Sequence, residues 1–257
     1  MQVRAENFTL LKNLVSQAKR VLLLVSNDPS VDTLAAGLFI RDQLVSVGAK
    51  VKLIAPGKLP ESLQDRRADI SDKLPAPKLV VSFNWRENAV DRVSYNLEGE
   101  NFNFLITPLN KKIDPGQVKV ATIGEEADLI ITLGIGSIGE YSKLDEELFN
   151  QKPLVNFDKS EKNELFGSLN FVQSSADSLC SVVANTFEKA SIEVKTDVQL
   201  LLLGLRESTE NFTSVTDPET FEAAAFCTRV KERKLGRPEA SREDWPAADF
   251  SVKENPN

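Results

Sequence analysis

The residues best suited to chemistry are a few carboxylates next to apolar runs. Asp28 and Asp32 lie in SNDPSVDTLAAGL (26–38), just after an apolar run, and Asp158 ends another run and is followed by Lys159 and Ser160. Carboxylates of this kind can bind a hard cation or do acid–base work. The chain contains no histidine. Ser-His-Asp and Cys-His catalysis and the usual Cys/His zinc sites are therefore excluded.

A glycine-rich segment is the second candidate site. GIGSIG (134–139) matches the G-x-G-x-x-G pattern, in which the backbone approaches a pyrophosphate at a helix N-terminus. It follows a predicted strand, and Asp158 comes near the spacing of the acidic residue that holds a ribose. Against this, Glu140 would lie next to the phosphates and the following helix is short. Binding of a dinucleotide cofactor through GIGSIG is left open.

Alternating strand and helix patterns position these residues. An apolar run at 20–26, a helix at 30–48 that Gly48 ends, and a strand at 50–56 predict a right-handed β-α-β unit in a parallel sheet. Further strands are predicted at 78–85, 127–134 and 152–158, and further helices at 8–19, 141–149, 175–190, 194–208 and 217–234. We expect an α/β fold with a mostly parallel sheet and helices on both faces.

An insertion and a tail depart from this alternation of strands and helices. RVSYNLEGENFNFLITP alternates around EGEN as a β-hairpin does, so we expect residues 86–120 to be a hairpin insertion at the sheet edge. From about Gly236 the chain is proline-containing and mixed in charge, with Trp245 and Phe250 as its large apolar residues. We expect residues 1–235 to form one domain and residues 236–257 a flexible or docked tail.

Composition narrows the classes of partner. The net charge of −7 and the pI near 5.0 argue against an extended nucleic-acid surface and against binding to acidic lipid. We expect no membrane span and no signal peptide, because the apolar runs are short, and hence a cytoplasmic location. Cys180 and Cys227 lie in predicted helices, where we expect buried thiols rather than a disulfide.

Taken in order, four segments resemble the motifs of the DHH phosphoesterase superfamily, which includes oligoribonuclease and phosphoadenosine-phosphate phosphatase types. The first family motif, His-x-x-Pro-Asp-x-Asp, falls on 26–32. Pro29 and Asp32 are kept there, while Ser26 replaces the histidine and Ser30 the first aspartate. The second motif is an aspartate that ends a strand, and Gly134 occupies that place.

The last two motifs are also incomplete. Asp-His-His falls on residues 158–160, where Lys159 and Ser160 replace both histidines. The fourth motif resembles GLRESTENF (204–212), in which Ser208 replaces the aspartate and Glu210 a glycine. The resemblance covers about residues 20–230. The family's C-terminal substrate-binding domain has no counterpart, since only the tail stands in its place.

The resemblance implies a two-metal site, generally of manganese, that activates water. Asp32 and Asp158 alone remain as strong ligands, enough for one weakly held Mn²⁺ or Mg²⁺ but not for a bridged pair. Asp28 would be a displaced ligand if its loop shifted in register. We expect Lys159 to fill the vacated space and pair with Asp158 or Asp32. Purely structural roles remain the alternative: Asp32 in a first helical turn, Asp158 in a turn and Lys159 in solvent.

Three functions follow. The first is a catalytically inactive DHH-like protein without a cofactor, which binds another protein, within a larger assembly, or a nucleotide-like ligand whose phosphate Gly134, Gly136, Lys159 and Ser160 would hold. The second is a weak or divergent metal-dependent phosphodiesterase for short oligonucleotides or nucleoside bisphosphates. The third is dinucleotide binding. The vestigial pocket would consist of Ser26, Asp28, Ser30, Asp32, Gly134, Asp158, Lys159, Ser160 and Ser208.

Overall fold

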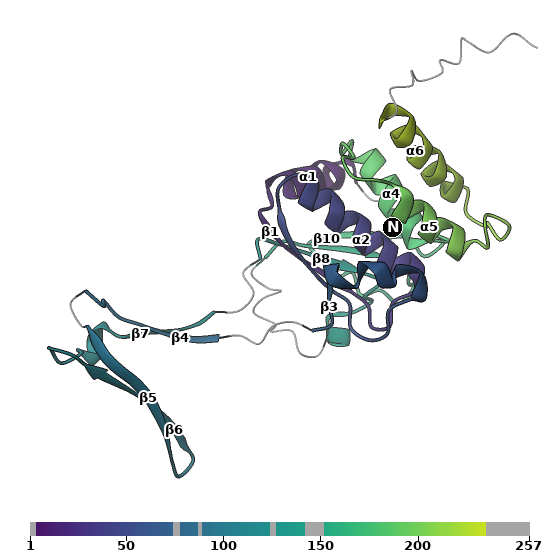
Figure 1. The fold of residues 1–257 in the computed structure, drawn as a ribbon. Coiled ribbons are helices and arrows are strands. Elements are labelled where there is room, and N and C mark those ends of the chain that lie inside the picture. The colour runs from purple at the N-terminus through teal and green to yellow at the C-terminus, as the bar shows by residue number, and fades with distance from the viewer. Residues whose placement is uncertain (1–3, 74–77, 87–88, 124–126, 142–151, 235–257) are drawn as a thin grey trace, which may run out of the picture. The chain divides into compact units, whose positions relative to one another are not determined.

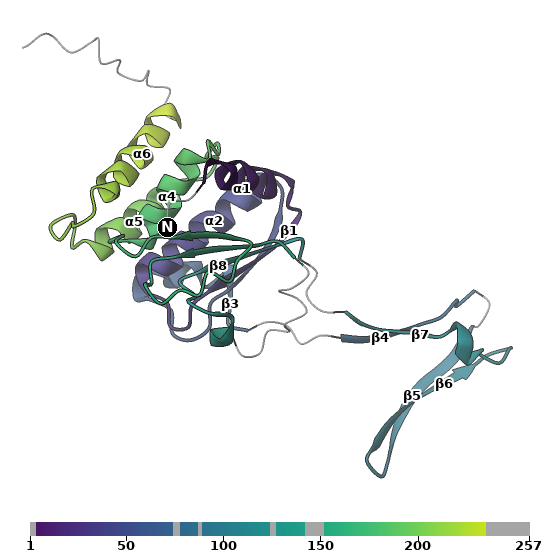
Figure 2. The ribbon, with the colours of Figure 1, turned by 180° about the vertical axis from the view of Figure 1, so that it is seen from behind.

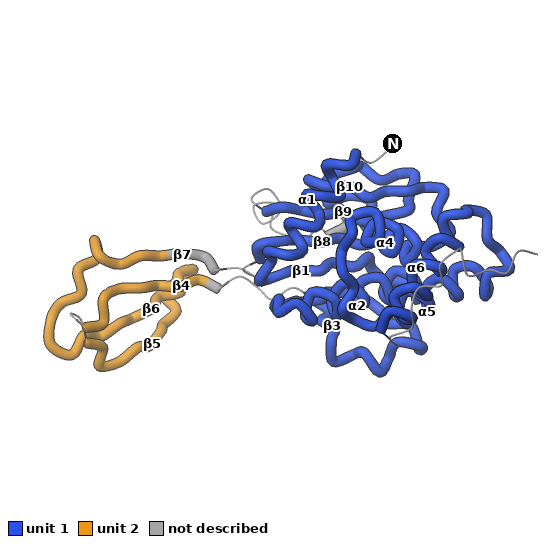
Figure 3. The backbone as a smooth tube through the Cα atoms, turned by 90° about the horizontal axis from the view of Figure 1, so that it is seen from above, with its two compact units in different colours: residues 1–73, 127–257 blue, residues 74–126 orange. Residues whose placement is uncertain are grey.

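The computed structural model describes residues 4–73, 78–86, 89–123, 127–141 and 152–234. The chain divides into a body, residues 1–73 and 127–257, and a small unit, residues 74–126 (Figure 3). The small unit is wider than the insertion that we expected at 86–120. It is wider because the strand at 78–82 pairs with residues 119–123, within the small unit, and not with the sheet of the body.

The body is built on a six-stranded parallel sheet (Figure 1). The strand order is β10-β9-β8-β1-β2-β3, and all adjacent strands run parallel. The strands are β1 (Arg20–Val25), β2 (Lys50–Ile54), β3 (Ile70–Ser71), β8 (Leu129–Leu133), β9 (Leu154–Asp158) and β10 (Leu169–Val172). The order reverses between β1 and β8. Open α/β sheets bind ligands beyond the carboxyl ends of the strands at such a switch point.

The central strands are buried on both of their faces, as their unbroken apolar sequences predicted. In β1, Leu23 and Val25 belong to the main core, and Leu22 and Leu24, which point the other way, are also fully buried. The predicted β-α-β unit is present as β1, α2 (Val31–Ser46) and β2. The expected parallel α/β sheet flanked by helices is confirmed.

Four further helices complete the described body. They are α1 (Ala5–Gln17), α4 (Leu179–Lys189), α5 (Gln199–Ser208) and α6 (Glu219–Lys234), together with the 3₁₀ segments η1 (Glu61–Asp69) and η3 (Ile138–Tyr141). Helices α2 and α4 lie side by side over the sheet, with α5 against both (Figure 2). Most of the helix expected at 141–149 and all of the tail at 236–257 lie outside the described residues. Cys180 and Cys227 are free and buried, as predicted.

The small unit consists of two antiparallel ribbons. Strand β4 (Lys78–Ser82) pairs with β7 (Lys119–Ile123), and β5 (Val90–Glu98) pairs with β6 (Asn101–Pro108); η2 (Pro115–Gln117) lies between β6 and β7. The hairpin predicted at EGEN is present, with Glu98 opposite Asn101. It forms a two-stranded sheet of its own and does not pair with a strand of the parallel sheet. No described helix is long and apolar enough to cross a membrane.

Candidate functional site at the carboxyl ends of the strands

Three of the four motifs meet where β1, β8 and β9 end. Residues 26–32 follow β1, residues 134–136 follow β8, and residues 158–160 end and follow β9. The backbone links them directly: Ser26 N donates to Leu133 O at 3.1 Å, and Gly134 N donates to Phe157 O at 3.0 Å. This shared edge results from the parallel arrangement, which brings all carboxyl ends to one side of the sheet.

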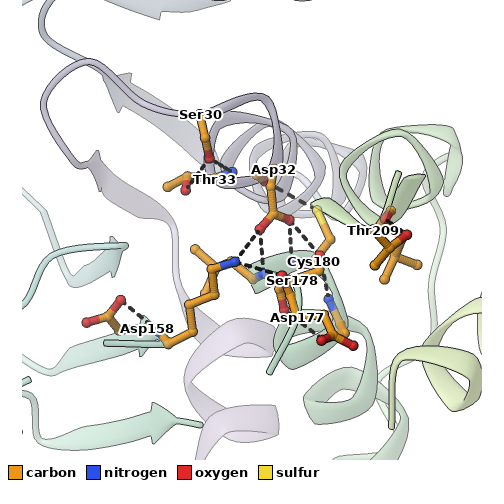
Figure 4. Close-up of polar contacts among 12 residues, drawn as sticks. Ser30, Asp32, Thr33, Asp158, Asp177, Ser178, Cys180 and Thr209 are labelled. Carbon is orange, nitrogen blue, oxygen red and sulfur yellow. Dashed lines mark hydrogen bonds and ion pairs between the residues drawn. The ribbon is translucent and has the colours of Figure 1, made fainter. Parts of the chain in front are cut away.

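Asp32 is buried at the start of α2 and binds the N-terminus of another helix, α4 (Figure 4). Its Oδ1 accepts hydrogen bonds from Ser178 Oγ at 2.7 Å and Cys180 N at 2.9 Å, and its Oδ2 accepts one from Leu179 N at 2.6 Å. These N–H groups are the unpaired donors that a helix leaves at its first turn. Asp32 therefore acts as the anion that caps α4.

Lys159 reaches across to the same carboxylate. Its Nζ lies 3.6 Å from Asp32 Oδ2 and donates to the carbonyl oxygen of Asp177 at 2.8 Å. The expected pairing with Asp32, rather than with Asp158, is the one that forms. The lysine side chain is 38% exposed, so solvent weakens the ion pair. Asp32 is thus approached by three neutral donors of α4 and one cation.

Asp158 is buried in a separate polar network. Its Oδ1 accepts from Lys159 N at 2.8 Å, and its Oδ2 accepts from Asn163 Nδ2 at 2.7 Å. The same amide of Asn163 also donates to Ile135 O at 3.1 Å, and its Oδ1 accepts from Asn156 Nδ2 at 3.1 Å. Asn163, which the sequence did not single out, therefore joins the loop after β9 to the end of β8 and to the middle of β9.

Gly134 occupies a place that has no room for a side chain. Its φ of +66° lies in the left-handed region, and a Cβ atom there would come within 2.9 Å of Thr33 Cγ2 and 3.3 Å of Ser26 Oγ. The start of α2 thus packs directly against the turn after β8. An aspartate at this position, as the second family motif has, would need backbone or side-chain movement.

The remaining predicted residues lie outside the networks of Asp32 and Asp158 and have structural roles. Asp28 is exposed at φ +45°, where its N donates to Pro56 O at 3.0 Å and its Oδ1 accepts from Lys58 N at 2.8 Å. Ser30 caps α2 by accepting from Thr33 N, Ser160 Oγ accepts from Lys162 N, and Ser208 ends α5, half-buried. From the fourth motif it is Gly204 that reaches the site, because a Cβ there would lie 3.0 Å from Asp32 Oδ1.

Asp177 and Ser178 are, like Asn163, site residues that sequence reasoning missed. Asp177 binds the first turn of α6 and the residues just before it: its Oδ2 accepts from Asp217 N at 3.0 Å and Thr220 Oγ1 at 2.8 Å, and its Oδ1 from Thr216 N at 3.1 Å. Burial raises the pKa of Asp177, but these hydrogen bonds outweigh it and lower the pKa overall. A Ser before an apolar run is a helix-start signal, yet nothing local identifies Asp32 as its partner.

The thiol of Cys180 is also part of this cluster. Its Sγ donates to the carbonyl oxygen of Asp32 at 3.3 Å. Burial, and then the neighbouring carboxylate of Asp32, raise its pKa well above the usual value. The thiolate is the nucleophilic form, so this cysteine is a packing residue and not a nucleophile.

The residues present do not fit a two-metal centre. In the described ranges, no group of three or more His, Cys, Asp or Glu residues is placed to hold a metal ion. Both oxygens of Asp32 and both of Asp158 already accept hydrogen bonds from the protein. Such a centre needs several ligands converging on two ions. Here the two carboxylates have different sets of donors and share only Lys159, whose backbone N–H serves Asp158 and whose amino group serves Asp32.

The glycine segment does not form the helix start that dinucleotide binding requires. Residues 134–137 are irregular and 138–141 form the 3₁₀ turn η3, so no α-helix begins at Gly136 within the described residues. The carbonyl oxygen of Gly136 accepts from Glu164 N at 2.8 Å. The loop after β9 thus packs against this glycine.

Comparison with known proteins identifies the fold and no more. No family model matches the chain. Among solved structures, it resembles an exopolyphosphatase-related protein from Bacteroides fragilis with a TM-score of 0.61 at 12% sequence identity. The match covers 91% of this chain and 59% of the other, so the chain spans little more than half of that protein's length. This chain therefore has the α/β fold of an exopolyphosphatase-related protein.

Proposed function

We propose that this chain is a degenerate DHH-like phosphoesterase relative that has lost metal-dependent catalysis and acts as a protein-binding module. One observation carries the proposal: the carboxylate of Asp32 is used inside the protein, by the N-terminus of α4 and by Lys159. Asp32 is the single aspartate of the first family motif that this sequence keeps. A carboxylate that is already paired and hydrogen-bonded offers little to an incoming cation.

The energies favour the internal partners. A hydrogen bond to a charged group contributes about 1.5–3 kcal/mol, so releasing three of them from Asp32 would cost about 5 kcal/mol or more. The N–H groups of Leu179 and Cys180 in the first turn of α4 would then lose their acceptor. One or two carboxylates bind Mg²⁺ or Mn²⁺ only weakly, with water completing the shell. The metal would therefore have to replace more interaction energy than it brings.

A nucleotide-like ligand is the less favoured partner, because the proposed phosphate donors are in use. Gly134 N donates to Phe157 O, and the amino group of Lys159 serves Asp32 and the carbonyl of Asp177. A protein partner suits the small unit, where Tyr95, Phe102 and other large apolar side chains are exposed. Binding through the small unit would leave the fold of the body unchanged.

The test is a calorimetric Mn²⁺ titration, with hydrolysis of a dinucleotide and of a nucleoside bisphosphate assayed on the same sample. We expect no saturable binding below about 1 mM and no turnover above the blank. Lys159→Ala should still lack turnover, since α4 continues to hold Asp32, and Lys162→Ala is the matched exposed control. Turnover that disappears in both Asp32→Asn and Asp158→Asn would instead establish a divergent phosphodiesterase.

A further inference from the structure

The hairpin β5–β6 has one apolar face and one polar face. The directly opposed pairs Val93–Ile106, Tyr95–Phe104 and Leu97–Phe102 alternate with the other pairs of the hairpin. Because successive side chains point to opposite sides of a strand, these six residues share one side. We call them the hairpin's apolar face. The opposite side carries Arg92, Ser94, Asn96, Glu98, Asn101, Asn103, Leu105 and Thr107.

The hairpin's apolar face is uncovered. Five of its six side chains are 55–74% exposed, and the sixth, Ile106, is half-buried. The aromatic rings contact one another: Tyr95 stacks on Phe102 at 5.3 Å, and Phe102 meets Phe104 edge-on at 5.4 Å. An isolated two-stranded sheet is only marginally stable in water, and exposed apolar patches of this kind mark interaction sites. This face requires a cover.

The described surface of the body has few exposed large apolar side chains. Its exposed large apolar side chains are Leu10, Val45, Val47, Leu165 and Phe221. They belong to α1, the C-terminal end of α2, the loop after β9, and α6, and none of these elements contributes more than two. A sheet face with three rows of large side chains needs a matching apolar surface of similar extent.

We propose that the hairpin's apolar face packs against the same face of a second copy of this chain. The proposal rests on the protein-binding role given above and names its partner. Two such faces can pack about 10 Å apart around a two-fold axis. In such an interface the same residues of both copies are used, and the contacts of one copy are repeated by the other. The side chains of the hairpin's apolar face expose about 600 Å² of surface to solvent in each copy. The pair would bury about 1,200 Å², the lower end for a specific interface.

Charge favours an antiparallel two-fold arrangement. Glu100 lies in the turn at the tip of the hairpin, whereas Lys111 and Lys112 follow the end of β6 near its base. All three of these side chains are exposed. When the two hairpins run in opposite directions, the acidic tip of each copy lies over the basic base of the other. Complementary charges of this kind set the orientation of an interface.

The first test is sedimentation equilibrium of the full chain at about 10–100 μM, where a dimer of micromolar Kd is well populated. We expect a dimer. Tyr95→Ser combined with Phe104→Ser should weaken dimerisation at least tenfold. The matched control is Leu105→Ser, because Leu105 is an exposed apolar residue on the opposite side of the hairpin. This change should alter the dissociation constant of the dimer less than threefold.

A second test does not depend on the apolar residues and so is unaffected if their substitution unfolds the hairpin. Glu100→Lys should weaken the dimer several-fold, and adding Lys111→Glu with Lys112→Glu should restore it. A chain that stays monomeric at about 100 μM, or a dimer that none of these changes affects, overturns the proposal. The Mn²⁺ titration decides separately whether catalysis is lost, so failure of the dimer leaves that conclusion standing.

Discussion

Lys159 Nζ lies 3.6 Å from Asp32 Oδ2, and the same carboxylate receives three hydrogen bonds from the start of α4. One side chain thus connects α2, α4 and the loop after β9 at the carboxyl edge of the sheet. Groups of the chain itself thus satisfy both oxygens of this carboxylate. If this cluster is a structural unit, substitutions within it should lower the stability of the body.

Asp32→Asn should destabilise the body. The amide NH₂ would replace an acceptor oxygen and face an N–H group of α4, while the charge opposite Lys159 would be lost. We expect the free energy of unfolding to fall by about 2–4 kcal/mol. Urea denaturation measures this. Glu222→Gln, on the exposed side of α6, is the control and should change stability by less than about 0.5 kcal/mol. A loss below about 1 kcal/mol would contradict a central role for Asp32.

Gly134→Ala should lower the free energy of unfolding by about 2–3 kcal/mol. Part of this loss comes from the positive φ at position 134, and part from overlap of the new Cβ atom with Thr33 Cγ2. Adding Thr33→Ser removes that methyl group but keeps a hydroxyl near Ser30, so it should recover part of the loss. Gly48→Ala is the matched control, because Gly48 has φ +93° and a Cβ atom there would meet no other atom within 4 Å. Equal losses at both glycines would show that overlap with Thr33 plays no part.

Gly204→Ala should destabilise the protein although alanine is the better helix former by about 1 kcal/mol. The new methyl group would overlap Cys180 Sγ and crowd Asp32 Oδ1, which costs about 1–3 kcal/mol in a packed core. Cys180→Ala in the same chain removes the sulfur and should relieve the strain. A double-mutant cycle by chemical denaturation should show a coupling above about 1 kcal/mol. Additive effects would mean that the two residues do not share this space.

Asp177→Asn should make stability less sensitive to acid. Because hydrogen bonds lower the pKa of Asp177 in the folded state, its contribution is present above the ordinary carboxyl pKa and is lost as the pH falls through the lowered value. The free energy of unfolding of the wild type should exceed that of Asp177→Asn by about 1–2 kcal/mol at pH 7. This difference should shrink below about pH 4. Thermal unfolding from pH 7 to pH 3 checks this. A difference that grows on acidification would reverse the assignment.

Several parts of the fold were predictable because they depend on short segments. The apolar run of β1, the helix that Ser30 caps and Gly48 ends, and the next strand form the β-α-β unit that the sequence indicated. The hairpin at EGEN also formed. The partner of the strand at 78–82 was not predictable, since an apolar run of that length fits a parallel sheet and an antiparallel ribbon equally well.

The candidate site was also predictable only in part. The sequence by itself excluded imidazole ligands, because the chain has no histidine, and it located Asp32, Asp158 and Lys159 at element ends. Only the tertiary structure decided what Asp32 binds, because Ser178 is 146 positions away and reaches it through packing of α4 on α2. Hydrogen-bond partners that distant depend on how whole elements pack, and no local pattern of residues encodes them.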